Sequence, residues 1–327
     1  MHLLLFFKKK LADYCDISTN HVIEWLNYYE IPYFRFNAED RYEIMEFTIS
    51  NDCNIIKLYS TLLKMEINLS EFTCSWYRRG DIVFKLNSDK QIANIDIRSY
   101  ISREYNAVKE YIFYFFENIP HLDSYFRRSL NKLMVLKEAT RVGFKVPFTK
   151  IFTGKLPTRG SIITKAITEG FTILVGKENY GTFTNRVPMD NNYNEILYSV
   201  SLIQELIEKE ADLRVFYLNG KCYAMAIMSQ TNEKSIIDFR TYPADKPNRR
   251  LSYFLPENVC NQLKELMTNL RLSTGSIDLI LTKQHDYVFL EINPVGQFGM
   301  TSFPCNYYLE KQIARSIKVM YDETKIS

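Results

Sequence analysis

Apolar and polar residues alternate most regularly near the C-terminal end of the chain, on both sides of a polar turn at 283–286. A period of two is typical of β-strands, so the pattern predicts a β-hairpin. Asp278 would lie on its first strand, and Glu291 and Asn293 would share one face of the second, because side chains two apart in a strand point to the same side. Three hard oxygen ligands would converge there, and such ligands suit Mg²⁺ bound together with phosphate oxygens.

The first third of the chain has the pattern of a small α/β domain. A strand at 2–7, a helix capped by Ser18 or Thr19 and a strand at 33–37 form a βαβ opening. A long helix is expected at 98–119, whereas the segments 44–49 and 55–67 are compatible with strand or helix. Pro120 to Arg128 is the expected domain boundary.

Strands dominate after one further helix, at 130–142, for which Ser129 is the expected cap and Gly143 the expected end. Asn219-Gly220 is the strongest turn signal and predicts a second hairpin. The other expected elements are strands at 146–152, 161–167, 171–177 and 199–207 and helices at 256–272 and 306–321. The chain is thus expected to be α/β (α+β), with an N-terminal α/β domain at 1–128, a central part at 129–204 and a C-terminal part with the metal site at 205–327.

Composition limits the function classes. A chain of 327 residues with 46% hydrophobic and 24% charged residues is expected to fold with more than one core. A net charge of +3 gives no support for nucleic acid as a partner. No apolar run approaches the roughly 20 residues of a membrane span, so no membrane partner is expected. Six scattered cysteines indicate a reduced, cytoplasmic protein without a zinc site.

Two lysines precede the metal-binding hairpin in positions that suit phosphate binding. Lys132 opens a helix after Asn131, and Lys165 interrupts an apolar strand. A lysine in an apolar strand needs either an anion or a route to solvent. The alternative for Lys165 is an edge strand from which its ammonium group reaches water.

The segment Glu205-Leu206-Ile207 runs from an apolar strand into a charged stretch. Its backbone could meet an adenine edge, and Asp212 could bind ribose hydroxyls. The alternative is an amphipathic strand followed by a solvated run of charges. Arg214 and Arg240 alternate with apolar neighbours, so each could project from a sheet towards phosphate or carboxylate. Two structural ion pairs are the alternative for these arginines.

The order of these motifs over residues 129–327 resembles that of the ATP-grasp superfamily, in particular its branch similar to ribosomal-protein glutamate ligases. A narrower resemblance, to the graspetide (microviridin-type) synthetases and their grasp-with-spasm subgroup, covers nearly the whole chain. It rests on Trp76-Tyr77-Arg78-Arg79, Ser102-Arg103-Glu104, Tyr253-x-Leu255-Pro256 and Phe289-Leu290-Glu291-Ile292-Asn293-Pro294-x-Gly296-Gln297.

The resemblance implies an ATP-grasp fold with an N-terminal pre-ATP-grasp domain and with ATP held between the central and C-terminal subdomains. It implies an ATP-dependent ligase in which Lys132 and Lys165 hold phosphates, Glu205, Leu206 and Ile207 hold adenine, and Asp212 holds ribose. Asp278, Glu291 and Asn293 would bind Mg²⁺, and Arg214 and Arg240 would supply catalytic positive charge.

The implied substrate is a ribosomal precursor peptide with leader and core, whose Asp or Glu side chains become acyl phosphates and then ester or amide cross-links. Arg78 and Arg79 would guide this peptide, although at most one of them would face the cleft if the segment is a strand; the alternative is a stack of arginine on aromatic rings that locks the domain junction. The chain would be a homodimer. An ATP-grasp ligase that adds a small amino acid to a peptide tail is one alternative, and a nucleotide-binding scaffold without turnover is another.

Two departures from the resemblance bear on the site. Thr241-Tyr242-Pro243 replaces the Gly-Gly pair usual in glutamate ligases, which disfavours free amino acids as substrates. The segment expected to cover the phosphates, 177–186, is also poorer in glycine than usual.

Overall fold

The computed structural model describes residues 2–7, 17–37, 39–85, 94–156, 161–168, 170, 172–176, 178–181, 184–187, 197–231, 235–242 and 245–326. The chain forms two compact units, one from Met1–Arg128 with Tyr308–Ser327 and the other from Ser129–Tyr307. The sequence pattern placed all of 205–327 in one C-terminal part. In the structure, Tyr308–Ser327 belongs to the first unit instead. The division after residue 204 stays a prediction.

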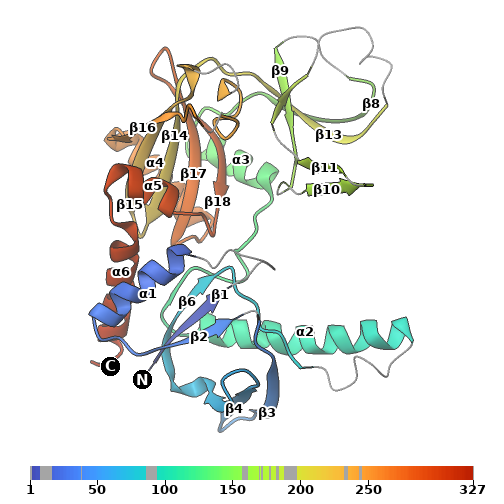
Figure 1. The fold of residues 1–327 in the computed structure, drawn as a ribbon, viewed down its shortest axis with the longest axis vertical. Helices are drawn as coiled ribbons and strands as arrows, with labels where there is room; N and C mark the ends of the chain where they lie inside the picture. The colour runs from blue at the N-terminus through green and yellow to red at the C-terminus, as the bar shows by residue number, and fades with distance from the viewer. Residues whose placement is uncertain are drawn as a thin grey trace. The chain divides into compact units, whose positions relative to one another are not determined.

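The first unit is built on two sheets (Figure 1). Four parallel strands lie in the order β2 (Tyr33–Asn37), β1 (His2–Phe7), β6 (Phe72–Arg78) and β7 (His121–Leu122). Three antiparallel strands form the second sheet, β3 (Tyr42–Ile49), β4 (Asn54–Ser60) and β5 (Met65–Asn68). The segments left open between strand and helix are therefore strands, and the alternate burial of side chains along β4 accounts for its apolar pattern.

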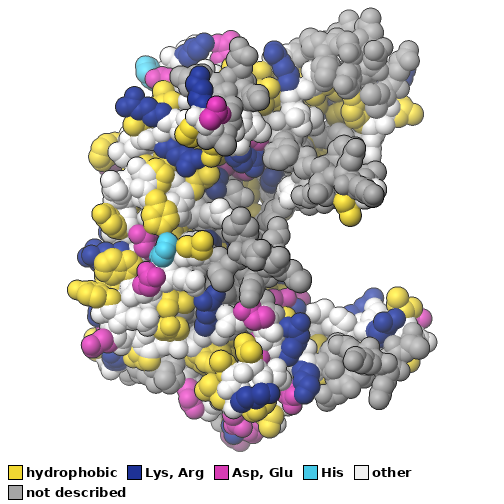
Figure 2. Space-filling model, in the orientation of Figure 1, with side chains coloured by type: hydrophobic (Ala, Val, Ile, Leu, Met, Phe, Trp, Pro, Cys, Tyr) yellow, Lys and Arg dark blue, Asp and Glu magenta, His cyan; other side chains and the backbone are white. Residues whose placement is uncertain are grey.

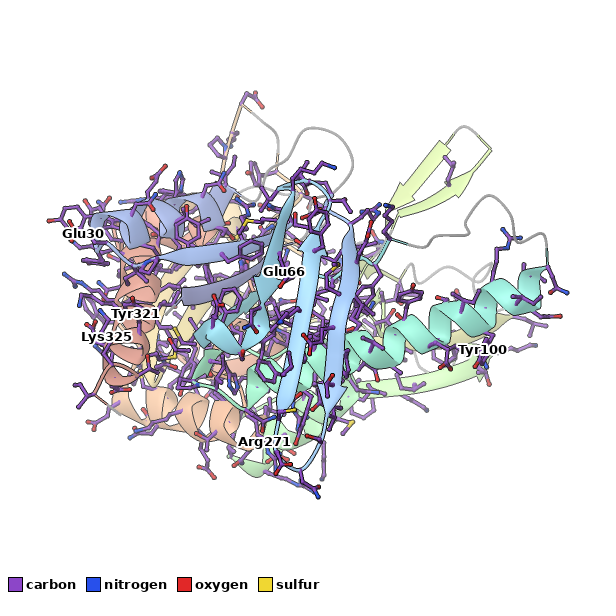
Figure 3. The ribbon with its side chains drawn as sticks, turned by 90° about the horizontal axis from the view of Figure 1, so that it is seen from below. Glu30, Glu66, Tyr100, Arg271, Tyr321 and Lys325 are labelled. Atoms are coloured by element: carbon purple, nitrogen blue, oxygen red, sulfur yellow. The ribbon has the colours of Figure 1, made fainter. Side chains whose placement is uncertain are left out.

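Two helices of this unit, α1 (Ile17–Tyr28) and α6 (Leu309–Glu323), pack against each other. α1 buries Val22, Ile23 and Leu26, as its spacing predicts. The cap expected at Ser18 or Thr19 is wrong, because the helix already begins at Ile17. At the far end of α6, Figure 3 shows Tyr321 beside Lys325, whose ammonium nitrogen lies 4.2 Å from the ring centroid.

Another helix of this unit, α2 (Ile95–Glu117), begins after Asn94, whose side chain accepts bonds from the backbone N–H groups of Asp96 and Ile97. It is buried only towards its end, at Ile112, Phe113 and Phe116. On the face shown in Figure 2, exposed hydrophobic side chains lie scattered among charged ones. Of the helices that the structure describes, none is both long and apolar enough to cross a membrane.

The second unit contains two larger sheets and a hairpin (Figure 1). One antiparallel sheet has the order β12 (Asn185–Arg186), β9 (Ile162–Lys165), β13 (Tyr198–Glu205) and β8 (Thr149–Gly154). The hairpin is β10 (Thr172–Val175) with β11 (Glu178–Gly181). Its second strand, β11, lies within the segment 177–186 expected to cover phosphates, of which Lys177, Thr182 and Phe183 lie outside the described residues. The other antiparallel sheet has the order β16 (Arg249–Tyr253), β15 (Lys221–Met228), β14 (Lys209–Leu218), β17 (Thr274–Thr282) and β18 (Tyr287–Asn293).

Helices α3 (Lys132–Arg141) and α4 (Glu257–Asn269) cover one face of the five-stranded sheet and share a hydrophobic core with it. Asn131 caps α3 by accepting bonds from the N–H groups of Leu133 and Met134, so the cap expected at Ser129 is wrong. Gly143, at φ +87°, ends this helix as predicted. A short helix, α5 (Gly299–Cys305), was not predicted.

The two faces of this sheet have different roles. Val215 and Ile277 point into the helix-covered core, whereas Phe216, the neighbour of Val215, contacts Phe298 at the start of α5. Strand alternation then places Arg214 and Asp278 on the face away from the core. The candidate site lies on that face.

Candidate active site

The β17–β18 hairpin forms as predicted, but its pairing contains a bulge. Asp278 pairs with Glu291, whereas Leu279 pairs with Phe289, so Leu290 is an extra residue. A strict period of two would place Phe289 on the same face as Glu291. The bulge lets Phe289 join Ile292 in the hydrophobic core while Glu291 stays opposite Asp278. Sequence alternation alone does not reveal this extra residue.

Both predicted phosphate-binding lysines meet at Glu291. The Lys132 ammonium nitrogen lies 3.3 Å, and that of Lys165 3.8 Å, from Oε2 of Glu291. The structure excludes the edge-strand alternative for Lys165, because β9 lies between β12 and β13 and the lysine side chain is only 15% exposed. Burial lowers the pKa of Lys165, and the Glu291 carboxylate opposes that shift.

The third carboxylate contact is an ion pair across two strands. Arg214 on β14 pairs in register with Asp278, and its Nη1 lies 2.6 Å from both carboxylate oxygens. The side chains are 12% and 13% exposed. Within the part of the chain that the structure describes, the buried Nε of Arg214 has no hydrogen-bond partner. Arg214 therefore keeps a donor at the site beyond its ion pair.

The two carboxylates of the hairpin respond differently to burial. Burial raises the pKa of Asp278, with Arg214 opposing and Glu291 adding to the shift. Burial also pushes the pKa of Glu291 upwards, but Lys165 and Lys132 outweigh it and hold that pKa below its ordinary value. Two carboxylates that face each other in register repel, so the site favours positive charge around them.

Arg240 brings a further positive charge. It follows η3 (Ser229–Thr231) in the chain and forms a two-point ion pair with Asp238, with Nε 2.8 Å from Oδ1 and Nη2 2.5 Å from Oδ2. Its charge favours the ionised forms of both Asp278 and Glu291 and lowers the pKa of Lys165. Arg214 and Arg240 thus form the structural ion pairs that the sequence left open, and their catalytic roles stay predictions.

Asp212 lies in a different environment from the one predicted. Its oxygens each lie 2.8 Å from the ammonium nitrogen of Lys209, and Oδ2 also accepts a bond from Ser229 at 2.5 Å. All three residues are buried. Because Lys209 and Ser229 already engage its carboxylate inside the protein, a ribose would have to compete with them. The ribose contact stays a prediction. Lys209, expected to be solvated in a run of charges, was missed because sequence does not show which member of such a run turns inwards.

The predicted adenine-binding segment, Glu205–Ile207, begins at the last residue of β13. The backbone N–H groups of Glu205 and Leu206 already donate to Phe148 and Ser161, and the Glu205 carboxylate accepts a bond from the Phe148 N–H. An adenine edge would therefore have to use other backbone groups of Glu205–Ile207. This role stays a prediction.

Arg78 and Arg79, the predicted peptide-guiding residues, belong to the first unit, whereas the hairpin belongs to the second. Arg78 ends β6 and is buried, and Arg79 follows it in a left-handed conformation with an exposed side chain. Of the two, Arg79 presents its side chain to solvent. Its contact with a substrate stays a prediction.

The donor set suits Mg²⁺ rather than a transition metal. Among the described residues there is no cluster of three or more His, Cys, Asp or Glu side chains. The hairpin offers two carboxylates in register and the amide of Asn293, which pairs with Ser276 two residues further along. Such a set leaves coordination positions for water and phosphate, as Mg²⁺ requires. The residues therefore fit the predicted ion.

Gly296, just after β18, is held tightly against the strand that carries Asp278. A methyl group added there would lie 2.2 Å from Oγ and 2.5 Å from the backbone nitrogen of Ser276, which pairs with Asn293. We expect Gly296→Ala to reduce the free energy of unfolding by about 1–3 kcal/mol and to weaken Mg²⁺ binding, because the backbone must move. Denaturant unfolding and metal titration measure the two effects. An unchanged stability would contradict the close approach.

Comparison with known proteins identifies the fold. No protein-family model matches the sequence, and a search of the curated proteins gives no match. Among solved structures, the chain is similar to a RiPP-associated ATP-grasp ligase from Chryseobacterium gregarium, described in complex with ADP and a leader and core peptide. The TM-score is 0.76 and the identity 23%, over 98% of this chain and 97% of that chain.

Two further similar structures are the macrocyclase MdnC of Microcystis aeruginosa MRC bound with precursor peptide MdnA, and the ATP-grasp ligase PsnB complexed with minimal precursor, Mg and ADP. MdnC has a TM-score of 0.74 and 23% identity, covering 96% of this chain and 98% of that chain. PsnB has a TM-score of 0.67 and 14% identity, covering 98% and 97%. Over nearly its whole length, the chain therefore has the ATP-grasp fold that its sequence predicts.

Proposed function

We propose that the protein is an ATP-dependent carboxylate ligase that cross-links a ribosomal precursor peptide. The observation that carries the proposal is the meeting of Lys132 and Lys165 at Glu291, directly opposite Asp278. Two ammonium groups beside a pair of carboxylates can neutralise both the phosphates of ATP and the site itself. The similar structures, which are described with ADP, Mg and precursor peptides, support this choice of ligands.

Each residue of the candidate site then has a proposed role. Asp278, Glu291 and Asn293 would hold Mg²⁺, which supplies charge neutralisation at the transferring phosphoryl group. Lys132 and Lys165 would bind phosphate oxygens, and Glu205–Ile207 would meet the adenine. Arg214 and Arg240 would face the charge that develops on the reacting carboxylate and phosphoryl groups.

In the proposed reaction a carboxylate oxygen of a peptide Asp or Glu side chain attacks the γ-phosphorus. The bond to the ADP oxygen breaks, and an acyl phosphate forms. A hydroxyl or amine of the same peptide attacks the acyl carbon, loses its proton and displaces inorganic phosphate, which leaves an ester or amide cross-link. Because donor and acceptor belong to one chain, their proximity favours ring closure over hydrolysis.

Lys165→Met tests the phosphate role with little disturbance of the strand. The methionine would retain most of the buried apolar volume but remove the charge next to Glu291. A lost charge-assisted hydrogen bond is worth about 1.5–3 kcal/mol, so nucleotide affinity should fall roughly 10- to 100-fold. Calorimetric titration with ADP and Mg²⁺ measures the change. The matched control is Lys145→Met, which removes an exposed lysine paired with Asp286 and should leave affinity unchanged.

Mass spectrometry distinguishes the candidate activities. The probe is a short precursor peptide rich in Thr, Ser, Lys, Asp and Glu, sought among the genes next to that of this protein and incubated with enzyme, ATP and Mg²⁺. The proposal predicts the loss of one water mass per cross-link. Gain of an amino-acid residue mass would instead identify a ligase for small amino acids. An unchanged peptide together with bound nucleotide would favour a scaffold without turnover.

The oligomeric state, the bound peptide and the cellular setting are further parts of the proposed function. We propose a homodimer that binds both leader and core peptide, with Arg79 available to the peptide because its side chain is exposed. The described cysteines are free thiols, which supports a reduced, cytoplasmic setting; Cys15 lies outside the described residues. Light scattering measures the mass in solution, and the mass of a single chain would contradict the dimer.

A further inference from the structure

A cluster of buried polar side chains contacts the backbone of the segment that carries Arg240. It was not predicted, and it links β14 to the chain between β15 and β16. Its members are Lys209, Asp212, Ser229, Ser235 and Asn248, all buried. We call this set the polar clasp. Buried polar groups cost free energy unless their hydrogen bonds are made, and such bonds fix the atoms that they join.

The polar clasp fastens the backbone on both sides of Asp238. Lys209 donates from its ammonium group to the carbonyl of Ile237 at 3.3 Å, and Asn248 donates from Nδ2 to the carbonyl of Phe239 at 2.9 Å. These carbonyls belong to the residues immediately before and after Asp238. The peptide units around the Asp238 side chain are thus held from two directions.

The rest of the polar clasp anchors these two donors. The ammonium group of Lys209 donates to the carboxylate of Asp212, which also accepts a hydrogen bond from the Ser229 hydroxyl. Ser235 Oγ lies 2.8 Å from the Ser229 carbonyl oxygen and 3.0 Å from Oδ1 of Asn248. The contacts run continuously from β14 to Asn248.

Asp238 in turn orients Arg240. The aspartate side chain is 5% exposed and that of Arg240 is 54% exposed, so the buried partner fixes the direction of the accessible one. Burial raises the pKa of Asp238, but the Arg240 guanidinium outweighs it and keeps that pKa below its ordinary value. The ion pair is therefore formed at neutral pH.

We infer that Asn248 and Lys209 are positioning residues that aim Arg240 at the nucleotide γ-phosphate through Asp238. This inference rests on the proposed function. An arginine with a mobile side chain loses much of its effect on a transferring phosphoryl group, and a supporting shell of fixed hydrogen bonds prevents that loss. The polar clasp supplies this shell without touching ATP.

A double-mutant cycle tests the inference without the peptide substrate. The variants are Asn248→Ala, Arg240→Gln and their combination, and the probes are AMPPNP and ADP, each with Mg²⁺, in calorimetric titrations. Lys209 is not chosen because its loss would leave Asp212 buried without its cation. Each single variant should weaken AMPPNP binding at least fivefold and ADP binding less than twofold. The combination should equal Arg240→Gln alone, since Asn248 acts through Arg240.

The control is Ser75→Ala in the first unit, which removes a buried hydroxyl that donates to the carbonyl of Phe116. It should match Asn248→Ala in melting temperature but leave the AMPPNP-to-ADP affinity ratio unchanged. Additive losses in the double variant, or an equal loss in the control, would overturn the inference while leaving the proposed function intact. Failure of the wild-type protein to bind either nucleotide would instead overturn the proposed function, and the inference with it.

Discussion

Glu291→Gln is expected to lower peptide-dependent ADP release by about 10²- to 10³-fold while the protein remains folded, because one preorganised charged group at a transferring phosphoryl group is worth about that much. The substitution keeps the size of the side chain. It leaves Lys132 and Lys165 without their shared anion. The two ammonium groups then repel Mg²⁺, so the affinity for the metal should fall, whereas the affinity for phosphate without metal should not.

Asp278→Asn should abolish turnover to a similar degree and also destabilise the protein. Its carboxylate is the partner of Arg214, and both side chains are largely buried. Breaking a buried pair costs about 3–5 kcal/mol, because one charge stays behind without its partner. The two variants therefore differ in stability although both lose the metal site.

The matched control for both is Asp286→Asn, in the turn of the same hairpin. Its ion pair with Lys145 is exposed, so the loss should cost less than about 1 kcal/mol and leave activity unchanged. Steady-state kinetics and denaturant unfolding give the comparison. Normal ADP release from Glu291→Gln would refute the assignment of Glu291 as a metal ligand.

The second large effect concerns α6, which belongs to the first unit although it ends the chain. Ile317 is fully buried, whereas Val319 on the same helix is 56% exposed. Ile317→Ala should reduce the free energy of unfolding by about 2–5 kcal/mol through the lost burial and the cavity left behind. Val319→Ala should have an effect of less than about 0.5 kcal/mol. Equal losses would contradict the packing of α6 into the first unit.

Removing Tyr308–Ser327 altogether should unfold the first unit. α6 packs against α1, and contacts between their side chains include the Lys311 ammonium 4.4 Å from the Trp25 ring centroid and a bond from Arg315 to Tyr29. The truncated protein should therefore lose the helix against which α1 packs. Limited proteolysis would then cut the first unit much faster than Ser129–Tyr307. Equal cleavage of both units would contradict this expectation.

The sequence predicted the parts of the fold that local chemistry determines. The Asn219-Gly220 turn was predicted because its conformation needs positive φ at both positions, and the structure has φ of 45° and 88° there. The β17–β18 hairpin followed from strand alternation. Lys165 was found because a charge in an apolar strand requires a partner, and Glu291 provides it.

Other features depend on contacts between distant segments and have no local signal. The bulge at Leu290 is invisible to alternation, because Phe289 and Glu291 have the same parity along the chain. From sequence, Lys209 is expected to belong to a solvated run of charges. In the structure it donates instead to Asp212 and to the Ile237 carbonyl inside the protein. The buried partners of Asp212 were missed for the same reason, because the sequence around it does not show which side chains turn inwards.

The central claim is that ATP activates a peptide carboxylate as an acyl phosphate. The most direct measurement uses a precursor peptide whose Asp and Glu side-chain carboxylates carry ¹⁸O, with mass analysis of the inorganic phosphate after one round of cross-linking. Attack of the carboxylate on the γ-phosphorus predicts one ¹⁸O atom in each phosphate released, because the bridging oxygen leaves with the phosphoryl group. Cross-linked peptide together with unlabelled phosphate would contradict the account.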